Sequence, residues 1–213
     1  KNVDVIFDES NIMNTLGEVI SKAGRKQIRI AETEKYPHVT FFFNGGQEEP
    51  FEGETRILCA SPRDVATYDL KPEMAAYDIT NAIIPEIEKE SADFICLNFA
   101  NTDMVGHTGV MSAAIKAAEI VDSCAEKIVN TAIEHGYNVV ILADHGNSDY
   151  MMNEDGSPNT QHTTNPVPFI LAQKNTEWTV AHGKLGDIAP SILTLMQIEI
   201  PAEMTGNIIV HKN

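Results

Sequence analysis

Five side chains in the second half of the chain could bind a metal ion. They lie in three short clusters, which are Asp103 with His107, Asp144 with His145, and His162. Carboxylate oxygens and imidazole nitrogens are the ligands that zinc and manganese favour when no thiolate is present. Each cluster lies in or just after a stretch that is predicted to be a buried strand or its exit loop, and no obvious nucleophile accompanies it. The sequence therefore predicts a metal site without a complete catalytic apparatus.

The spacing of the clusters carries this interpretation. Asp103 and His107 are four residues apart, so one turn of helix can aim both at one ion. Asp144 and His145 follow directly on the apolar run 139–142, and Gly146 lets the loop wrap tightly. Taken singly, each motif has a simpler explanation as a helix cap or a solvated histidine, because short motifs occur often by chance. With His162 as a third ligand, the usual number at a catalytic metal site, the joint pattern favours a ligand role.

The remaining candidates are weaker. His38, His135, His182 and His211 are interpreted as structural or solvated. Lys35 follows a predicted strand and could neutralise a substrate phosphate as a point charge. From the sequence alone, a solvated lysine is the favoured interpretation.

The elements that must position these residues alternate between short apolar runs and helical patterns. This alternation predicts an α/β fold with a mainly parallel sheet flanked by helices. The unit from Phe94 to Leu142 is expected to be a right-handed βαβ crossover. The simplest division is one compact domain over 13–213, preceded by an entry segment over 1–12. Strands are predicted at 3–7, 27–31, 38–43, 56–60, 93–99, 138–143 and 167–172, and helices at 15–23, 72–90, 111–135 and 187–196.

Composition and charge limit the classes of protein to which this chain can belong. The 213 residues contain 15 basic and 31 acidic side chains, which gives a net charge of −16. Such a surface disfavours nucleic acid and anionic lipid as partners. No apolar run approaches the roughly 20 residues that span a bilayer, and no signal peptide is visible. Three dispersed cysteines are expected to be structural thiols in a reducing, cytoplasmic setting.

Several stretches resemble a known family. They are 31–46, 68–74, 98–107, 143–147 and 201–206, and they resemble the cofactor-independent phosphoglycerate mutases, which belong to the alkaline-phosphatase-like superfamily. The resemblance runs from about residue 14 to residue 206.

The resemblance implies an alkaline-phosphatase-like domain that an inserted phosphotransferase domain splits in sequence. Residues 1–12 would be the stub of the insert and its hinge, and 13–213 the C-terminal part of the phosphatase domain, with an incomplete sheet. It also implies two manganese ions and no 2,3-bisphosphoglycerate. Asp103, His107 and His162 match the ligands of one ion, Asp144 and His145 match two ligands of the second, and Lys35 matches a contact to the substrate phosphate.

Some of that family's catalytic and binding residues lie outside this sequence. The nucleophilic serine and a further aspartate precede the insert, and the insert carries the phosphate-binding arginines, so no serine of this chain is assigned. The implied parent is a monomeric glycolytic isomerase that interconverts 3- and 2-phosphoglycerate through a phosphoseryl enzyme. This chain alone is expected to be inactive and able to self-associate through an exposed sheet edge. A related metal-dependent phosphatase, a phosphopentomutase and a non-catalytic metal-binding remnant are the alternatives.

Overall fold

A three-stranded parallel sheet forms the centre of the computed structural model, which describes residues 12–175 and 177–213. Its strand order is β2 (Glu54–Cys59), β1 (Gln27–Glu32) and β3 (Phe94–Leu97). All six residues of β1 are buried, because this strand has a neighbour on both edges and a layer of helices on both faces. The α/β class and the parallel sheet predicted from the sequence are confirmed.

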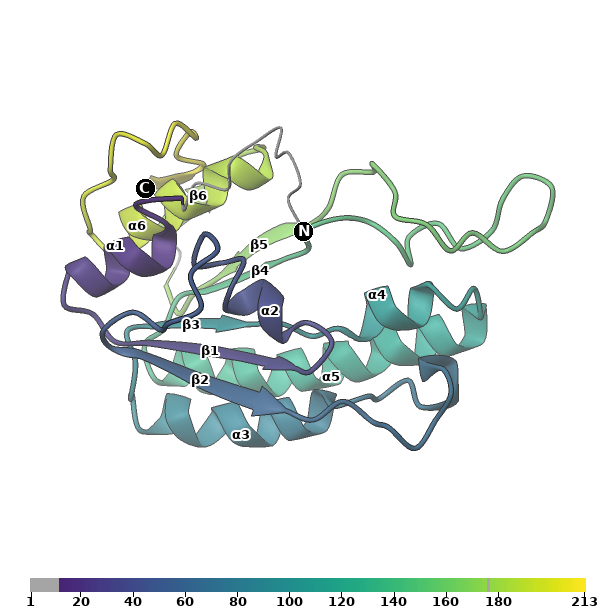
Figure 1. Ribbon diagram of the computed structural model, residues 1–213. Coiled ribbons are helices and arrows are strands. Elements are labelled where there is room, and N and C mark those ends of the chain that lie inside the picture. Colours follow the sequence, from purple (N-terminus) through teal and green to yellow (C-terminus); the bar gives the residue numbers. More distant parts are fainter. Residues whose placement is uncertain (1–11, 176) are drawn as a thin grey trace, which may run out of the picture.

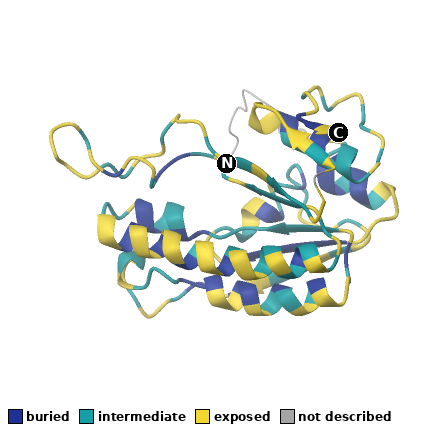
Figure 2. Ribbon diagram, turned by 180° about the vertical axis from the view of Figure 1, so that it is seen from behind, coloured by how far each residue is buried: buried dark blue, intermediate teal, exposed yellow. Residues whose placement is uncertain are grey.

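Helices cover the two faces of this sheet (Figure 1). On one face α3 (Ala76–Glu88) and α5 (Met111–Glu134) lie side by side, and Ile79, Ile83 and Ile87 of α3 pack with Ile28 and Ile30 of β1. On the other face lie α1 (Leu16–Lys22) and α6 (Ile188–Leu195). Figure 2 shows the buried side of α3 and α5 turned toward the sheet and the exposed side turned to solvent.

Two further pairs of strands are antiparallel. They are β4 (Val139–Leu142) with β5 (Phe169–Ala172), and β6 (Trp178–Val180) with β7 (Val210–Lys212). Helix α5 leads from β3 to β4 as predicted, but within the described residues β4 pairs with β5 and not with β3. The two strands that α5 connects therefore do not lie side by side in one sheet, as the expected βαβ crossover predicted.

The strand predicted at 38–43 is wrong. Residues 36–39 form the short helix α2 (Tyr36–Val39), and turns follow it. Pro37 stands in the first turn, where its missing N–H costs no hydrogen bond. The amide of Phe42 donates to the carbonyl of Pro37, and that of Asn44 to Thr40, so local bonds replace a strand ladder.

The other predicted elements within the described residues are present, with shifted ends. The helix expected from Pro72 begins at Ala76, because Met74 has a positive φ of 43° and the chain turns there. The sequence did not predict the helix α4 (Asn101–Gly106), the strands β6 and β7, or the 3₁₀ turns η1 (Tyr68–Leu70) and η2 (Leu185–Asp187).

Some expectations lie outside the described residues. The strand predicted at 3–7 falls there, as does all but the last residue of the segment 1–12. Among the residues described, no helix has both the length and the apolar character that a bilayer crossing requires.

Candidate metal centre

Two of the predicted ligands lie on one short helix. Helix α4 begins four residues after β3, with Asp103 in its first turn and His107 as its C-cap. The amide of His107 donates to the carbonyl of Asp103 at 3.0 Å, which is one helical turn. Because residues four apart share a face of a helix, both side chains point the same way. Their imidazole Nε2 and carboxylate Oδ1 are 3.1 Å apart.

The third predicted ligand reaches this helix from a distant loop. The amide of Thr163 donates to the carbonyl of Gly146 at 2.9 Å, which ties the loop of His162 to the exit of β4. His162 Nε2 then lies 3.0 Å from Asp103 Oδ1 and 3.1 Å from His107 Nε2. Within the described part of the chain, these three side chains form the one group of three or more histidine, cysteine, aspartate or glutamate residues that could hold an ion, with ligand atoms no more than 4.8 Å apart. We call Asp103, His107 and His162 the triad.

The hydrogen bonds around the triad suit a metal ion. His107 Nδ1 lies 2.7 Å from the carbonyl oxygen of Thr160. A carbonyl can only accept, so Nδ1 carries the proton and Nε2 keeps its lone pair for the triad. Asn147 Nδ2 donates to Asp103 Oδ1 at 2.9 Å and fixes the carboxylate. One carboxylate and two imidazoles held in this way fit a divalent cation.

Lys35 contacts the triad directly. It lies three residues beyond β1, and its Nζ is 2.5 Å from Asp103 Oδ2, with both side chains largely buried. Burial alone would raise the pKa of Asp103, but the hydrogen bond and charge of Lys35, with Asn147 and His107, hold that pKa below its ordinary value. Asp103 is therefore an anion at neutral pH, as a metal ligand must be. Lys35 and Asp103 follow neighbouring parallel strands, at the sheet edge where α/β folds place their sites.

The predicted pair Asp144 and His145 lies beside the triad. The ring of His145 stacks on that of His162, with centroids 3.6 Å apart and planes 20° apart. His145 Nε2 is 3.6 Å from Asp144 Oδ1, and the Asp144 side chain is exposed. The structure thus brings His145 against the triad and leaves Asp144 at the surface.

Sequence reasoning missed three contributors to this region. His38 on α2 lines the same cleft as Lys35, Asp103 and Asp144, and burial followed by the charge of Lys35 lowers its pKa. It was overlooked because 38–43 was interpreted as a strand. Asn147 and the Thr160 carbonyl were also missed, although Asn147 stands directly after the Asp-His-Gly motif. His135 lies elsewhere, 3.5 Å from Glu90.

Comparison with known proteins places this chain in a family. Residues 5–200 match the Metalloenzyme superfamily. The chain belongs to this superfamily. A solved relative, Leishmania mexicana phosphoglycerate mutase at low cobalt concentration, superposes with a TM-score of 0.86 and 26% identity, over 94% of this chain and 40% of that one. The α/β fold of this superfamily member is thereby confirmed.

Curated relatives named 2,3-bisphosphoglycerate-independent phosphoglycerate mutase confirm the resemblance seen in the sequence. That of Flavobacterium psychrophilum is 65% identical over 207 residues, which are 97% of this chain and 41% of the relative. That of Clostridium botulinum is 55% identical over 211 residues, which are 99% of this chain and 41% of the relative. The chain spans about two fifths of the length of the curated relatives it matches.

Proposed function

We propose that this chain is the metal-holding part of a 2,3-bisphosphoglycerate-independent phosphoglycerate mutase, an isomerase that interconverts 3- and 2-phosphoglycerate. The observation that supports this most directly is the triad itself, three potential ligands within 4.8 Å of one another. The triad occurs in a chain that is 65% identical to such a mutase over 97% of its length. The domain assignment of 1–12 as hinge and 13–213 as phosphatase part belongs to the same proposal.

Each residue at the site has a role in this proposal. The triad holds one divalent ion, which we infer to be manganese, and Asp144 and His145 supply two ligands to a second. Lys35 places a positive charge beside the triad, where it binds the phosphate of phosphoglycerate. Bound ions supply charge that screens the phosphoryl group and lowers the pKa of an attacking hydroxyl. Without such cations, a net charge of −16 would repel a phosphorylated substrate.

The nucleophile is not among the residues of this site. We infer that a serine in the part of such mutases outside the matched region takes the phosphoryl group and returns it to the neighbouring hydroxyl. No 2,3-bisphosphoglycerate is needed for this cycle, and a reducing, cytoplasmic setting suits the three free cysteines. The chain by itself should then form no 2-phosphoglycerate from 3-phosphoglycerate and Mn²⁺. Sustained turnover by the purified chain would overturn this assignment.

Calorimetric titration with Mn²⁺ tests the ligand set. The unmodified chain should bind one ion tightly, because the triad is preassembled while the Asp144/His145 pair offers only two ligands. His107→Ala should weaken this binding by more than about 100-fold, since it removes a ligand itself rather than an outer-shell contact. His211→Ala, which alters a distant exposed histidine, is the matched control and should leave affinity unchanged. Equal affinity in His107→Ala and the unmodified chain would contradict the proposal.

A further inference from the structure

His38 lies beside Lys35 on the short helix α2. Lys35 is the N-cap of this helix, and the amide of His38 donates to the carbonyl of Lys35 at 3.0 Å. Because residues three apart share a face of a helix, the two side chains leave α2 on the same side. Both line the cleft that also borders Asp103, Asp144 and His145. A ligand held by Lys35 would therefore lie in the same part of the cleft as His38.

The ring of His38 has no hydrogen-bond partner among the residues that the structure describes. The other two described histidines that line the cleft both have one close polar contact. His135 Nδ1 lies 3.5 Å from Glu90 Oε1, and His145 Nδ1 lies 3.3 Å from the carbonyl oxygen of Gly146. The His38 side chain is exposed, so its unpaired ring is free to bind a ligand in the cleft.

The surroundings of His38 orient its ring without using its nitrogens. The ring packs edge-on against Phe42, with centroids 5.3 Å apart and planes at 73°. Phe42 is held in turn, because its amide donates to the carbonyl of Pro37 at 2.9 Å. The hydroxyl of Thr40 donates to the carbonyl of Tyr36 at 2.7 Å and closes the same turn. His38 is therefore positioned before a ligand arrives, which lowers the entropic cost of binding.

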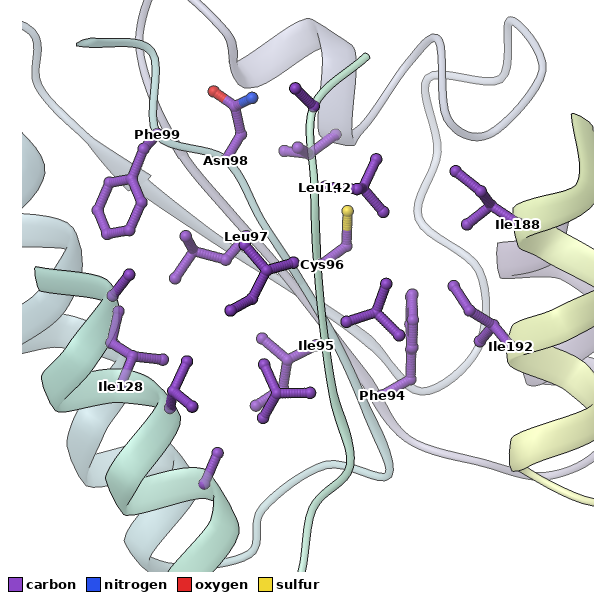
Figure 3. Close-up of a pocket in the computed structure, with 18 of the residues that line it drawn as sticks. Phe94, Ile95, Cys96, Leu97, Asn98, Phe99, Ile128, Leu142, Ile188 and Ile192 are labelled. Atoms are coloured by element: carbon purple, nitrogen blue, oxygen red, sulfur yellow. The ribbon is translucent and has the colours of Figure 1, made fainter. Parts of the chain in front are cut away.

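The polarity of the cleft limits where an anion can bind. The cleft has a volume of about 1480 Å³, larger than the roughly 300–1,000 Å³ of ordinary ligand pockets, so polar groups and not shape must place a small ligand. Figure 3 shows that much of the lining is apolar and includes Ile95, Leu97, Leu142 and Ile192. Asn98 directly follows β3, on the side from which the chain continues to the triad. An anion would therefore bind at this polar end, beside the triad and α2.

The charges around His38 suit a neutral hydrogen-bond donor. Burial in the cleft, followed by the charge of Lys35, lowers the pKa of His38, so its ring is uncharged at neutral pH. An uncharged imidazole keeps one N–H, which can donate to a phosphoryl oxygen. It adds no positive charge beside Asp103, where Lys35 already opposes a bound cation. A phosphoryl group at Lys35 would thus gain a second donor without a weaker metal site.

We propose that His38 contacts the substrate and that its ring N–H donates to the phosphoryl group bound by Lys35. This inference rests on the proposed function, because the phosphate site at Lys35 is taken from there. It adds an uncharged donor to a site that otherwise binds phosphate through positive charge. The ligand is a phosphate monoester, for which inorganic phosphate is the simplest probe.

Binding of inorganic phosphate to the Mn²⁺-loaded chain provides the test. Calorimetry measures the affinity for Mn²⁺, and the paramagnetic broadening of the phosphorus resonance reports phosphate bound near the ion. His38→Ala should raise the dissociation constant of phosphate at least about 10-fold, as expected for the loss of a hydrogen bond to a charged group. Its affinity for Mn²⁺ should be unchanged, because His38 is not a member of the triad.

Three further variants make the result specific. His211→Ala alters a distant exposed histidine and should bind phosphate as the unmodified chain does. His38→Gln retains an N–H donor and should recover part of the affinity that His38→Ala loses. Lys35→Ala should weaken phosphate binding while Mn²⁺ binds at least as tightly, since the charge of Lys35 opposes a nearby cation.

Each contrary result has a distinct meaning. The proposed hydrogen bond is refuted if His38→Ala binds phosphate as tightly as the unmodified chain, or if His38→Gln binds it no better than His38→Ala. A loss of Mn²⁺ affinity in His38→Ala would make His38 a metal ligand and would refute the proposed contact as well. In these cases Lys35→Ala still tests the phosphate site of the proposed function. If the unmodified chain binds Mn²⁺ but no phosphate, the phosphate site at Lys35 is refuted, and the role of His38 with it.

Discussion

Asp103 is the residue on which the site converges. Its Oδ1 contacts His107, His162 and Asn147, and its Oδ2 contacts Lys35. A metal ion and Lys35 would therefore share one carboxylate. The charge of Lys35 keeps that carboxylate ionised, and the same charge opposes a nearby cation, so Lys35 both prepares the ligand and limits its affinity.

A prediction at the residue scale concerns Tyr68, whose hydroxyl donates to Glu34 Oε1 at 2.6 Å. Burial, reinforced by Glu34, raises the pKa of Tyr68 from 10.0 to about 12. The protonated Tyr68 hydroxyl therefore contributes fully to the stability of the fold below pH 10, and this contribution is lost as the pH rises through 12. Tyr68→Phe should remove the ultraviolet absorbance step near pH 12 and flatten the fall of stability in that range. Tyr77→Phe, which alters an exposed tyrosine, should retain both, and an unchanged step in Tyr68→Phe would refute this account.

At the scale of elements, helix α4 brings Asp103 and His107 into position for the triad. This helix of six residues packs mainly against α5, and its last residue, Gly106, lies against the loop after β4. A Cβ on Gly106 would collide with Asn147 Oδ1 and approach Ser148 Oγ to 2.7 Å. Glycine here lets the loop come close enough for Asn147 to hold Asp103.

Gly106→Ala should therefore disturb both stability and metal binding. We expect a loss of about 1–3 kcal/mol in urea unfolding, as is usual for overpacking, together with weaker Mn²⁺ binding because Asn147 is displaced. Gly186→Ala is the control, since an added Cβ there meets nothing within 4 Å. If Gly106→Ala and Gly186→Ala have the same free energy of unfolding in urea, the close approach at Gly106 does not contribute to stability.

The elements also show what the sequence could and could not predict. Short runs that contain apolar, β-branched residues identified β1 to β5, because these strands pack in the interior of the fold. The same cue failed at 38–43, where the aromatic run forms turns bonded to Pro37 and Thr40 rather than a ladder. Helix α4 was missed because six residues are too few for propensity to form a helix without packing. The ligand residues were found by type and spacing, but the contact of His162 with His107, 55 residues away, depends on tertiary structure.

For the whole molecule, metal binding should raise the melting temperature. An ion that binds only the folded chain adds about 2.7 kcal/mol at 100 times its dissociation constant. For a chain of this length each kcal/mol shifts the melting temperature by about 2–4 °C. Mn²⁺ should therefore raise Tm by roughly 5–10 °C, and a chelator should reverse the rise. The double variant His107→Ala/His162→Ala should show no shift, and an equal rise in that variant would exclude the triad as the site.

The sequence separation within the triad has a consequence for chain topology. His107 and His162 are 55 residues apart in sequence, and the loop between them includes α5, β4 and the exposed turns near Gly156. An ion held by both ends would act as a removable cross-link across that loop, worth roughly 4 kcal/mol if treated like a disulfide of the same span. Metal supply would then govern how long the exposed turns withstand proteases, because an open loop unfolds locally far more often than a closed one.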